Sequence, residues 1–209
     1  MPSTSTFALF LGTALLLAAM PGPGLLYIAG RTLAAGRSVG LASSLGTAFG
    51  GLVHVLAGAL GVSALVMASA TAFTALKLLG GLYLIYLGIR TWLAAGHPGP
   101  TREGDVTDRG ALGQGFVVEA TNPKTAAFFI ALIPQFIDTG AGSVALQFMA
   151  FGLVSVALNT CMAIGVTYGA SALRSKVVGK AHVMRRLQQA SGVSLGGLGV
   201  SLLLARRPA

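Results

Sequence analysis

The chain has 209 residues and a net charge of +9; 54% of its residues are hydrophobic and only 9% are charged. Its mean hydropathy is +0.80, whereas soluble domains carry about 25% charged residues. This composition excludes an ordinary soluble surface and predicts an integral membrane protein. The positive charge does not indicate nucleic-acid binding, because the cations lie in short polar gaps between apolar blocks, where they act as topology signals and meet anionic lipid.

Six apolar blocks along the chain predict membrane-spanning helices. A bilayer core of about 30 Å requires roughly 20 apolar residues per helix, and long apolar runs without alternation favour helices over barrel strands. The last block is the shortest and is rich in glycine. The predicted spans are residues 7–29, 41–68, 73–94, 113–137, 143–170 and 190–204.

A polar linker at residues 97–112, which contains Pro98 and Pro100, divides the chain into two units, residues 1–96 and residues 113–209. Each unit contains three predicted spans. Because three is odd, the second unit enters the membrane upside down, which predicts a 3+3 inverted repeat, a common transporter architecture. The predicted fold class is therefore all-α, with about six transmembrane helices.

Lysines and arginines gather on one side of this topology, and an excess of these residues marks the cytoplasmic side of a membrane protein. The other side receives Lys77, Arg206 and Arg207, and Lys124 falls within a span. This asymmetry predicts that both termini lie outside the cytoplasm. The cations on the cytoplasmic side are Arg31, Arg37, Arg90, Arg102, Arg109, Arg174, Lys176, Lys180, Arg185 and Arg186.

Prolines interrupt the first and fourth spans at corresponding places. A proline removes an N–H donor and distorts the helix, and a freed backbone group in lipid costs several kcal/mol unless protein or water lines the gap. One break alone would indicate a packing kink, but two breaks in matching spans favour a transport site. The candidate substrate-binding residues are Pro21, Gly22, Pro23, Asn122, Pro123 and Lys124.

Two ionisable residues, Glu119 and Lys124, lie in the fourth span. A lysine or aspartate at the bilayer centre costs about 2.5–3.5 kcal/mol on insertion scales, so such groups usually face a cavity or a partner. Lys124 could bind a substrate carboxylate, with Asn122 offering donors and acceptors beside it. Alternatively, Glu119 lies near the interface and Lys124 snorkels or forms a structural pair.

His54 lies on a stripe of the second span that also contains Gly46, Gly50 and Gly58. Small residues at four-residue spacing let another helix approach closely, so the stripe could be a packing seam with a structural histidine. Because imidazole titrates near neutral pH, His54 could instead carry protons. The proton-coupling candidates are His54 and Glu119, and Asn159 of the fifth span is expected to face the interior.

Motifs for catalysis are missing from the sequence. It contains no HExxH, no histidine and cysteine cluster with metal-ligand spacing, and no Gly-rich loop that ends in Lys-Ser or Lys-Thr. We therefore expect no enzyme activity, no metal and no cofactor. Transport would have to draw on an ion or substrate gradient.

Together with the two proline breaks, three stretches resemble the LysE/RhtB family of amino-acid exporters: GRSVGLASSLGTAFGGLVH at residues 36–54, LKLLGGLYLIYLGIR at 76–90 and GFVVEATNPKTAAFFIALIPQF at 115–136. The resemblance covers most of the chain. It implies a secondary transporter in the bacterial cytoplasmic (inner) membrane that exports amino acids or related metabolites and is coupled to the proton motive force. It also places the six candidate binding residues on the family's signature motifs.

The resemblance does not identify the solute, because members differ among basic, branched-chain and hydroxy amino acids, and distant relatives handle metal cations. Few acidic residues lie within the spans, which disfavours a basic or metal substrate and favours a neutral amino acid or a derivative. A metal-cation or other small-solute exporter, and a membrane scaffold without transport, are the alternatives. The expected partners are the small-molecule substrate, protons and membrane lipids, and the glycine stripes permit a homodimer.

Overall fold

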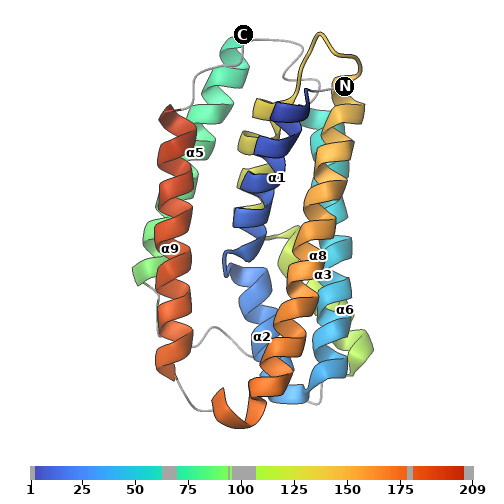
Figure 1. Ribbon diagram of the computed structural model, residues 1–209, viewed down its shortest axis with the longest axis vertical. Helices are drawn as coiled ribbons and strands as arrows, with labels where there is room; N and C mark the ends of the chain where they lie inside the picture. Colours follow the sequence, from blue (N-terminus) through green and yellow to red (C-terminus); the bar gives the residue numbers. More distant parts are fainter. Residues whose placement is uncertain (1–2, 63–69, 94, 96–106, 178–180, 205–209) are drawn as a thin grey trace.

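The structure is a computed structural model that describes residues 3–62, 70–93, 95, 107–177 and 181–204. The regular elements in these ranges are all helical, which agrees with the all-α prediction. The helices run roughly along the long axis of the molecule, and the first predicted span lies in the middle of the view (Figure 1).

The first predicted span is a broken helix. It consists of α1 (Thr4–Ala19) and α2 (Pro23–Ala35), whose axes differ by 44°. The chain is extended at Met20 and Gly22, and Pro23 occupies the first turn of α2, where its missing N–H costs no hydrogen bond. After α2, Gly36 adopts φ 95°, a conformation that glycine accommodates most easily, and the next helix begins.

The fourth predicted span is broken in the same way. It consists of α6 (Asp108–Ala120), α7 (Pro123–Ala127), a π-helical turn η2 (Phe128–Leu132) and a 3₁₀ turn η3 (Ile133–Phe136), with a 40° bend at the break. Asn122 caps α7, since its side-chain oxygen accepts the Lys124 N–H at 3.0 Å. Both breaks predicted from the prolines are therefore present.

The remaining helices surround these broken spans. They are α3 (Arg37–Ala57) with the π turn η1 (Gly58–Val62), α5 (Ala70–Leu93), α8 (Val144–Val177) and α9 (Ala181–Leu204). Helix α3 packs against α6 and α8, while α5 and α9 lie side by side as a pair (Figure 1). Glycines let α5 and α9 approach, because a Cβ at Gly88 would overlap the Gly192 carbonyl.

Aromatic side chains fill the core beyond the first break. Phe10 of α1 packs 4.4 Å from Phe151 of α8 and 5.3 Å from Phe136 of η3, as measured between ring centroids. Phe10 and Phe151 are buried. This cluster joins α1, η3 and α8 on the side of the breaks that lies toward the N-terminus of α1.

Two helices in the described part of the chain are long and apolar enough to cross a bilayer, Arg37–Gly61 and Val144–Leu173. Each bent pair adds one more if it counts as a single span, so the structure supports two to four spans. The six-span inverted repeat and the division into two units therefore stay predictions. Residues 97–106 of the predicted linker and residues 63–68 of the second span lie outside the described residues.

Several predicted boundaries differ from the observed helices. Helix α9 begins at Ala181, well before the predicted start at residue 190, and α6 begins at Asp108 inside the predicted linker. Arg185 and Arg186 are exposed on α9, so its first turns combine helical structure with a polar surface. Apolar content alone therefore underestimates the length of these helices.

Candidate functional site

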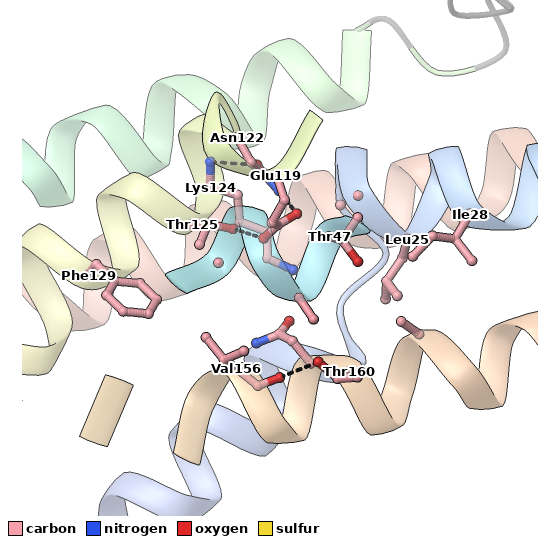
Figure 2. Close-up of a pocket in the computed structure, with 16 residues that line it drawn as sticks. Leu25, Ile28, Thr47, Glu119, Asn122, Lys124, Thr125, Phe129, Val156 and Thr160 are labelled. Carbon is pink, nitrogen blue, oxygen red and sulfur yellow. Dashed lines mark hydrogen bonds between the residues drawn. The ribbon is translucent and has the colours of Figure 1, made fainter. Parts of the chain in front are cut away.

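A small cavity lies where the two broken spans meet (Figure 2). Its volume is about 30 Å³, which is room for roughly two water molecules. Residues of α2, α3, α6, α7, η2 and α8 line it. They are Gly22, Gly24, Leu25, Ile28, Thr47, Ala48, Gly51, Glu119, Asn122, Lys124, Thr125, Phe129, Val156, Asn159, Thr160 and Ala163.

Lys124 reaches from the second break to the first. Its side chain is buried, with 5% exposed, and Nζ donates to the carbonyl oxygens of Leu17 and Met20, both at 2.9 Å. These carbonyls belong to the end of α1, where the last carbonyls of a helix lack the usual i+4 backbone donors; the Leu17 oxygen also accepts the Met20 N–H at 3.2 Å. The ammonium group therefore stabilises the end of α1, and two of its three N–H donors are used there.

Glu119 lies at the end of α6, with its carboxylate held by the start of α7. Oε2 accepts from Asn122 Nδ2 at 2.9 Å, and Oε1 accepts from the Thr125 hydroxyl at 2.6 Å. Figure 2 shows Glu119, Asn122, Lys124 and Thr125 gathered around the same turn. The 40° bend at the break lets residues on either side of Pro123 bind one another.

Two glycines of the first break make room for these charged side chains. A Cβ at Gly22 would lie 2.8 Å from Lys124 Cδ, and a Cβ at Gly24 would overlap the Glu119 carboxylate. Sequence reasoning singled out Gly22 but missed Gly24. The signal was present, because Gly24 completes a Pro-Gly-Pro-Gly sequence, but the neighbour that requires the glycine lies in a distant segment.

The structure brings Gly22, Asn122 and Lys124 of the six predicted binding residues to the cavity wall. Pro21, Pro23 and Pro123 are not among the lining residues; they lie at the two breaks and shape the backbone there.

His54 contacts the site from outside the cavity. Its Nε2 lies 2.9 Å from the main-chain oxygen of Glu119, and its ring centroid lies 5.7 Å from that of Phe129. Since a carbonyl only accepts, Nε2 carries the hydrogen. On the same stripe, Cβ atoms at Gly46 and Gly50 would overlap the backbone of α6, so these glycines form a packing seam.

Beyond the cavity, polar side chains join α2 to α6. The Tyr27 hydroxyl donates to the Ala111 carbonyl at 3.1 Å, and Arg31 Nη2 donates to Gln114 Oε1 at 2.5 Å. The Arg31 guanidinium also lies 5.7 Å from the centre of the Tyr27 ring. These contacts lie along α2 on the side of the cavity opposite the aromatic cluster of Phe10.

The remaining polar lining residues come from α3 and α8. Thr47, Asn159 and Thr160 face the cavity together with the apolar side chains of Leu25 and Val156. The sequence predicted an interior position for Asn159, and the structure places it there. In the described part of the chain, no group of three histidine, cysteine, aspartate or glutamate side chains could hold a metal ion.

Residues 15–206 match the family of LysE type translocators. The chain belongs to this family. It is 30% identical over 198 residues to an "uncharacterized membrane protein" of Vibrio cholerae, covering 94% of this chain and 96% of that one. It is also 30% identical over 198 residues to the "homoserine/homoserine lactone efflux protein" of Salmonella typhimurium, covering 94% of this chain and 95% of that protein. No solved structure matches the chain.

Family membership confirms the resemblance drawn from the sequence motifs. The protein is a membrane translocator of small solutes and is not an enzyme. The cavity between the broken helices is its candidate transport site.

Proposed function

We propose that this translocator exports amino acids or closely related small metabolites from the cytoplasm, and that they bind in the cavity between the two breaks. The observation that carries the proposal is the buried ammonium group of Lys124 at the cavity wall. Its two hydrogen bonds to carbonyls leave one N–H donor for a substrate carboxylate. Asn122 lies beside it, and the second N–H of its side-chain amide remains available as a donor to the substrate.

Alternating access around the two broken helices would move the substrate. A cavity of about 30 Å³ is too small for an amino acid, so the helices around it must separate to admit one. The contacts of Tyr27 and Arg31 with α6 would open on one side, and the aromatic cluster of Phe10 on the other. The excess of cations at the Arg31 end supports an orientation with this end in the cytoplasm and both termini outside, in a bacterial inner membrane.

Export would be coupled to the proton motive force, with His54 and Glu119 as the candidate proton carriers. Glu119 lines the cavity, whereas His54 binds the Glu119 main chain from outside it. A carrier that shares the substrate's space can couple the two movements directly, so this geometry favours Glu119.

The first solute to test is a neutral amino acid with a hydroxyl group. The Salmonella typhimurium relative is named for homoserine and homoserine lactone efflux, and the cavity combines threonine hydroxyls with the apolar side chains of Leu25 and Val156. A metal-cation exporter is a weaker candidate, because Lys124 would repel a cation and Glu119 alone provides too few oxygen ligands.

Proteoliposomes preloaded with labelled homoserine and a mixture of neutral, basic and acidic amino acids test this function. Under an imposed pH gradient, one or a few species should leave, and Lys124→Ala should abolish their loss. Arg186→Ala, which changes an exposed arginine, is the matched control and should transport normally. If no amino acid leaves in either orientation of the protein, the proposal is wrong. If Lys124→Ala folds and transports normally, the assigned site is wrong.

A further inference from the structure

We infer that the Glu119 carboxylate binds the ammonium group of the exported amino acid, opposite the carboxylate that Lys124 binds. This inference rests on the proposed function and adds the second half of a clamp for a zwitterion. It assigns the substrate class to solutes that carry a free amine next to a carboxylate.

The first step is that the two charged groups of the cavity, Lys124 and Glu119, form their hydrogen bonds with neutral partners. Lys124 donates to two main-chain carbonyls, and Glu119 accepts from Asn122 and Thr125. Each Glu119 oxygen keeps a lone pair, and Lys124 keeps an N–H. Lys124 is buried and Glu119 is half-buried, and a charge removed from water is costly unless an oppositely charged group meets it. A zwitterion between the two would supply a partner to each.

The second step is that the part of the cavity wall formed by α3 and α8 offers hydrogen-bond acceptors. The hydroxyl hydrogen of Thr47 is donated to the Ser44 carbonyl at 2.9 Å, and that of Thr160 to the Val156 carbonyl at 2.8 Å. Their oxygens therefore present only lone pairs to the cavity that both residues line. An ammonium group has three hydrogens, so it can bind Glu119 and still use acceptors on this wall.

The third step is that the Glu119 carboxylate is already held in place. Asn122 and Thr125 fix one oxygen each, and the missing side chain at Gly24 provides the space that the carboxylate occupies. A pre-positioned charge binds a ligand without the cost of ordering its side chain.

A proton and an ammonium group would exclude each other at this carboxylate. The titratable groups near it are Lys124 of α7, which lines the same cavity, and His54 of α3, on the Glu119 main-chain oxygen. The cavity-lining residues of α2 and α8 include no titratable side chain. Protonation of Glu119 would weaken amine binding, which gives an exporter its exchange of substrate for protons.

The test compares amino acids with analogues that lack only the α-amine. The pairs are L-homoserine with 4-hydroxybutanoate, L-leucine with 4-methylpentanoate, and L-lysine with 6-aminohexanoate. Affinities are measured on the purified full-length protein, with unfolding temperatures as the check on folding. For the amino acid that binds, the wild type should prefer it over its analogue by about 10- to 100-fold, as expected for charge-assisted hydrogen bonds. Glu119→Gln should remove this preference, and Glu119→Asp should retain most of it.

The outcomes separate this inference from the proposed function. If Glu119→Gln weakens both members of a pair equally, Glu119 only positions its neighbours and the inference is wrong, while amino-acid binding stands. If the wild type binds no member of any pair, the proposed function fails and the inference falls with it. If Glu119→Gln does not fold, Thr125→Val decides, because it removes the hydroxyl that holds one Glu119 oxygen. Thr125→Val should reduce the preference for the amino acid over its analogue, and equal weakening of both would contradict the inference.

Discussion

The two breaks look alike in sequence, yet they contribute different chemistry to the cavity. The first break, from Met20 to Pro23, contributes backbone: carbonyls at the end of α1, and glycines that leave space. The second break contributes side chains, since Glu119, Asn122 and Lys124 surround Pro123. Two proline breaks of similar sequence therefore need not perform the same task, and the charged groups come from one half of the chain.

Each break is also completed by a side chain from the other half. Lys124 binds the carbonyls at the end of α1, and His54 binds the carbonyl of Glu119 at the end of α6. At both helix ends the last carbonyls lack the usual i+4 backbone donors, although the Leu17 and Glu119 oxygens also accept the N–H groups of Met20 and Asn122. Hydrogen bonds from side chains of each half thus join the two breaks to the opposite half of the chain.

The largest effect is expected from Lys124→Met, which removes the donor that links the breaks. Efflux should fall about 100-fold or more, because the substitution removes the ammonium group that binds the substrate carboxylate and also disturbs the geometry of the first break. Leaving a buried carbonyl unsatisfied costs about 1–3 kcal/mol, so the unfolding temperature should also fall. Efflux from proteoliposomes and thermal unfolding measure the two effects. Arg186→Met is the exposed control, and wild-type stability in Lys124→Met would contradict the bridging role.

Two glycines of α2 allow a matched comparison on one helix. A Cβ at Gly24 would overlap the Glu119 carboxylate, whereas a Cβ at Gly30, also in α2, meets no atom within 4 Å. Gly24→Ala should lower efflux about 10-fold or more, because Glu119 must move out of place. Gly30→Ala should leave efflux unchanged and stabilise α2 by up to about 1 kcal/mol. Equal effects of the two substitutions would show that Gly24 is not there to make space.

The sequence predicted the features whose physics is local. Proline chemistry located both breaks, and the cost of a charge within a span indicated Lys124 as a site residue. Gly24 and Thr125 were missed, because an ordinary glycine or threonine gains its role only when a distant segment packs against it. The partner of His54 is a main-chain carbonyl, a group that every residue has, so no sequence pattern could indicate it.

Helix boundaries were predicted least well for a related reason. Helix α9 starts at Ala181 with exposed arginines on its first turns, where hydropathy predicts a polar segment. Apolar content marks the part of a helix that suits lipid, not the part that is helical.

Asn122 has two tasks at the second break, and two substitutions separate them. Its oxygen caps α7, and its amide nitrogen donates to Glu119. Asn122→Ala should destabilise the protein by about 1 kcal/mol, the usual loss of an N-cap, and should also impair efflux. Asn122→Ser keeps a capping oxygen and removes the amide donor, so it should retain stability while efflux still falls several-fold. Full efflux in Asn122→Ser would show that Glu119 does not depend on this donor.

The smallest effect is expected at His54, the capping side chain of the second break. His54→Gln keeps an N–H donor within reach of the Glu119 carbonyl but removes the titratable ring. If His54 serves as this donor, its replacement should change efflux less than threefold, and the dependence of efflux on the pH gradient should stay intact. His54→Phe, which has no donor, should destabilise the protein by about 1 kcal/mol. Loss of the pH dependence in a stable His54→Gln variant would instead make His54 the proton carrier. The two breaks would then differ further, with one half of the chain binding the substrate and the other half carrying the proton.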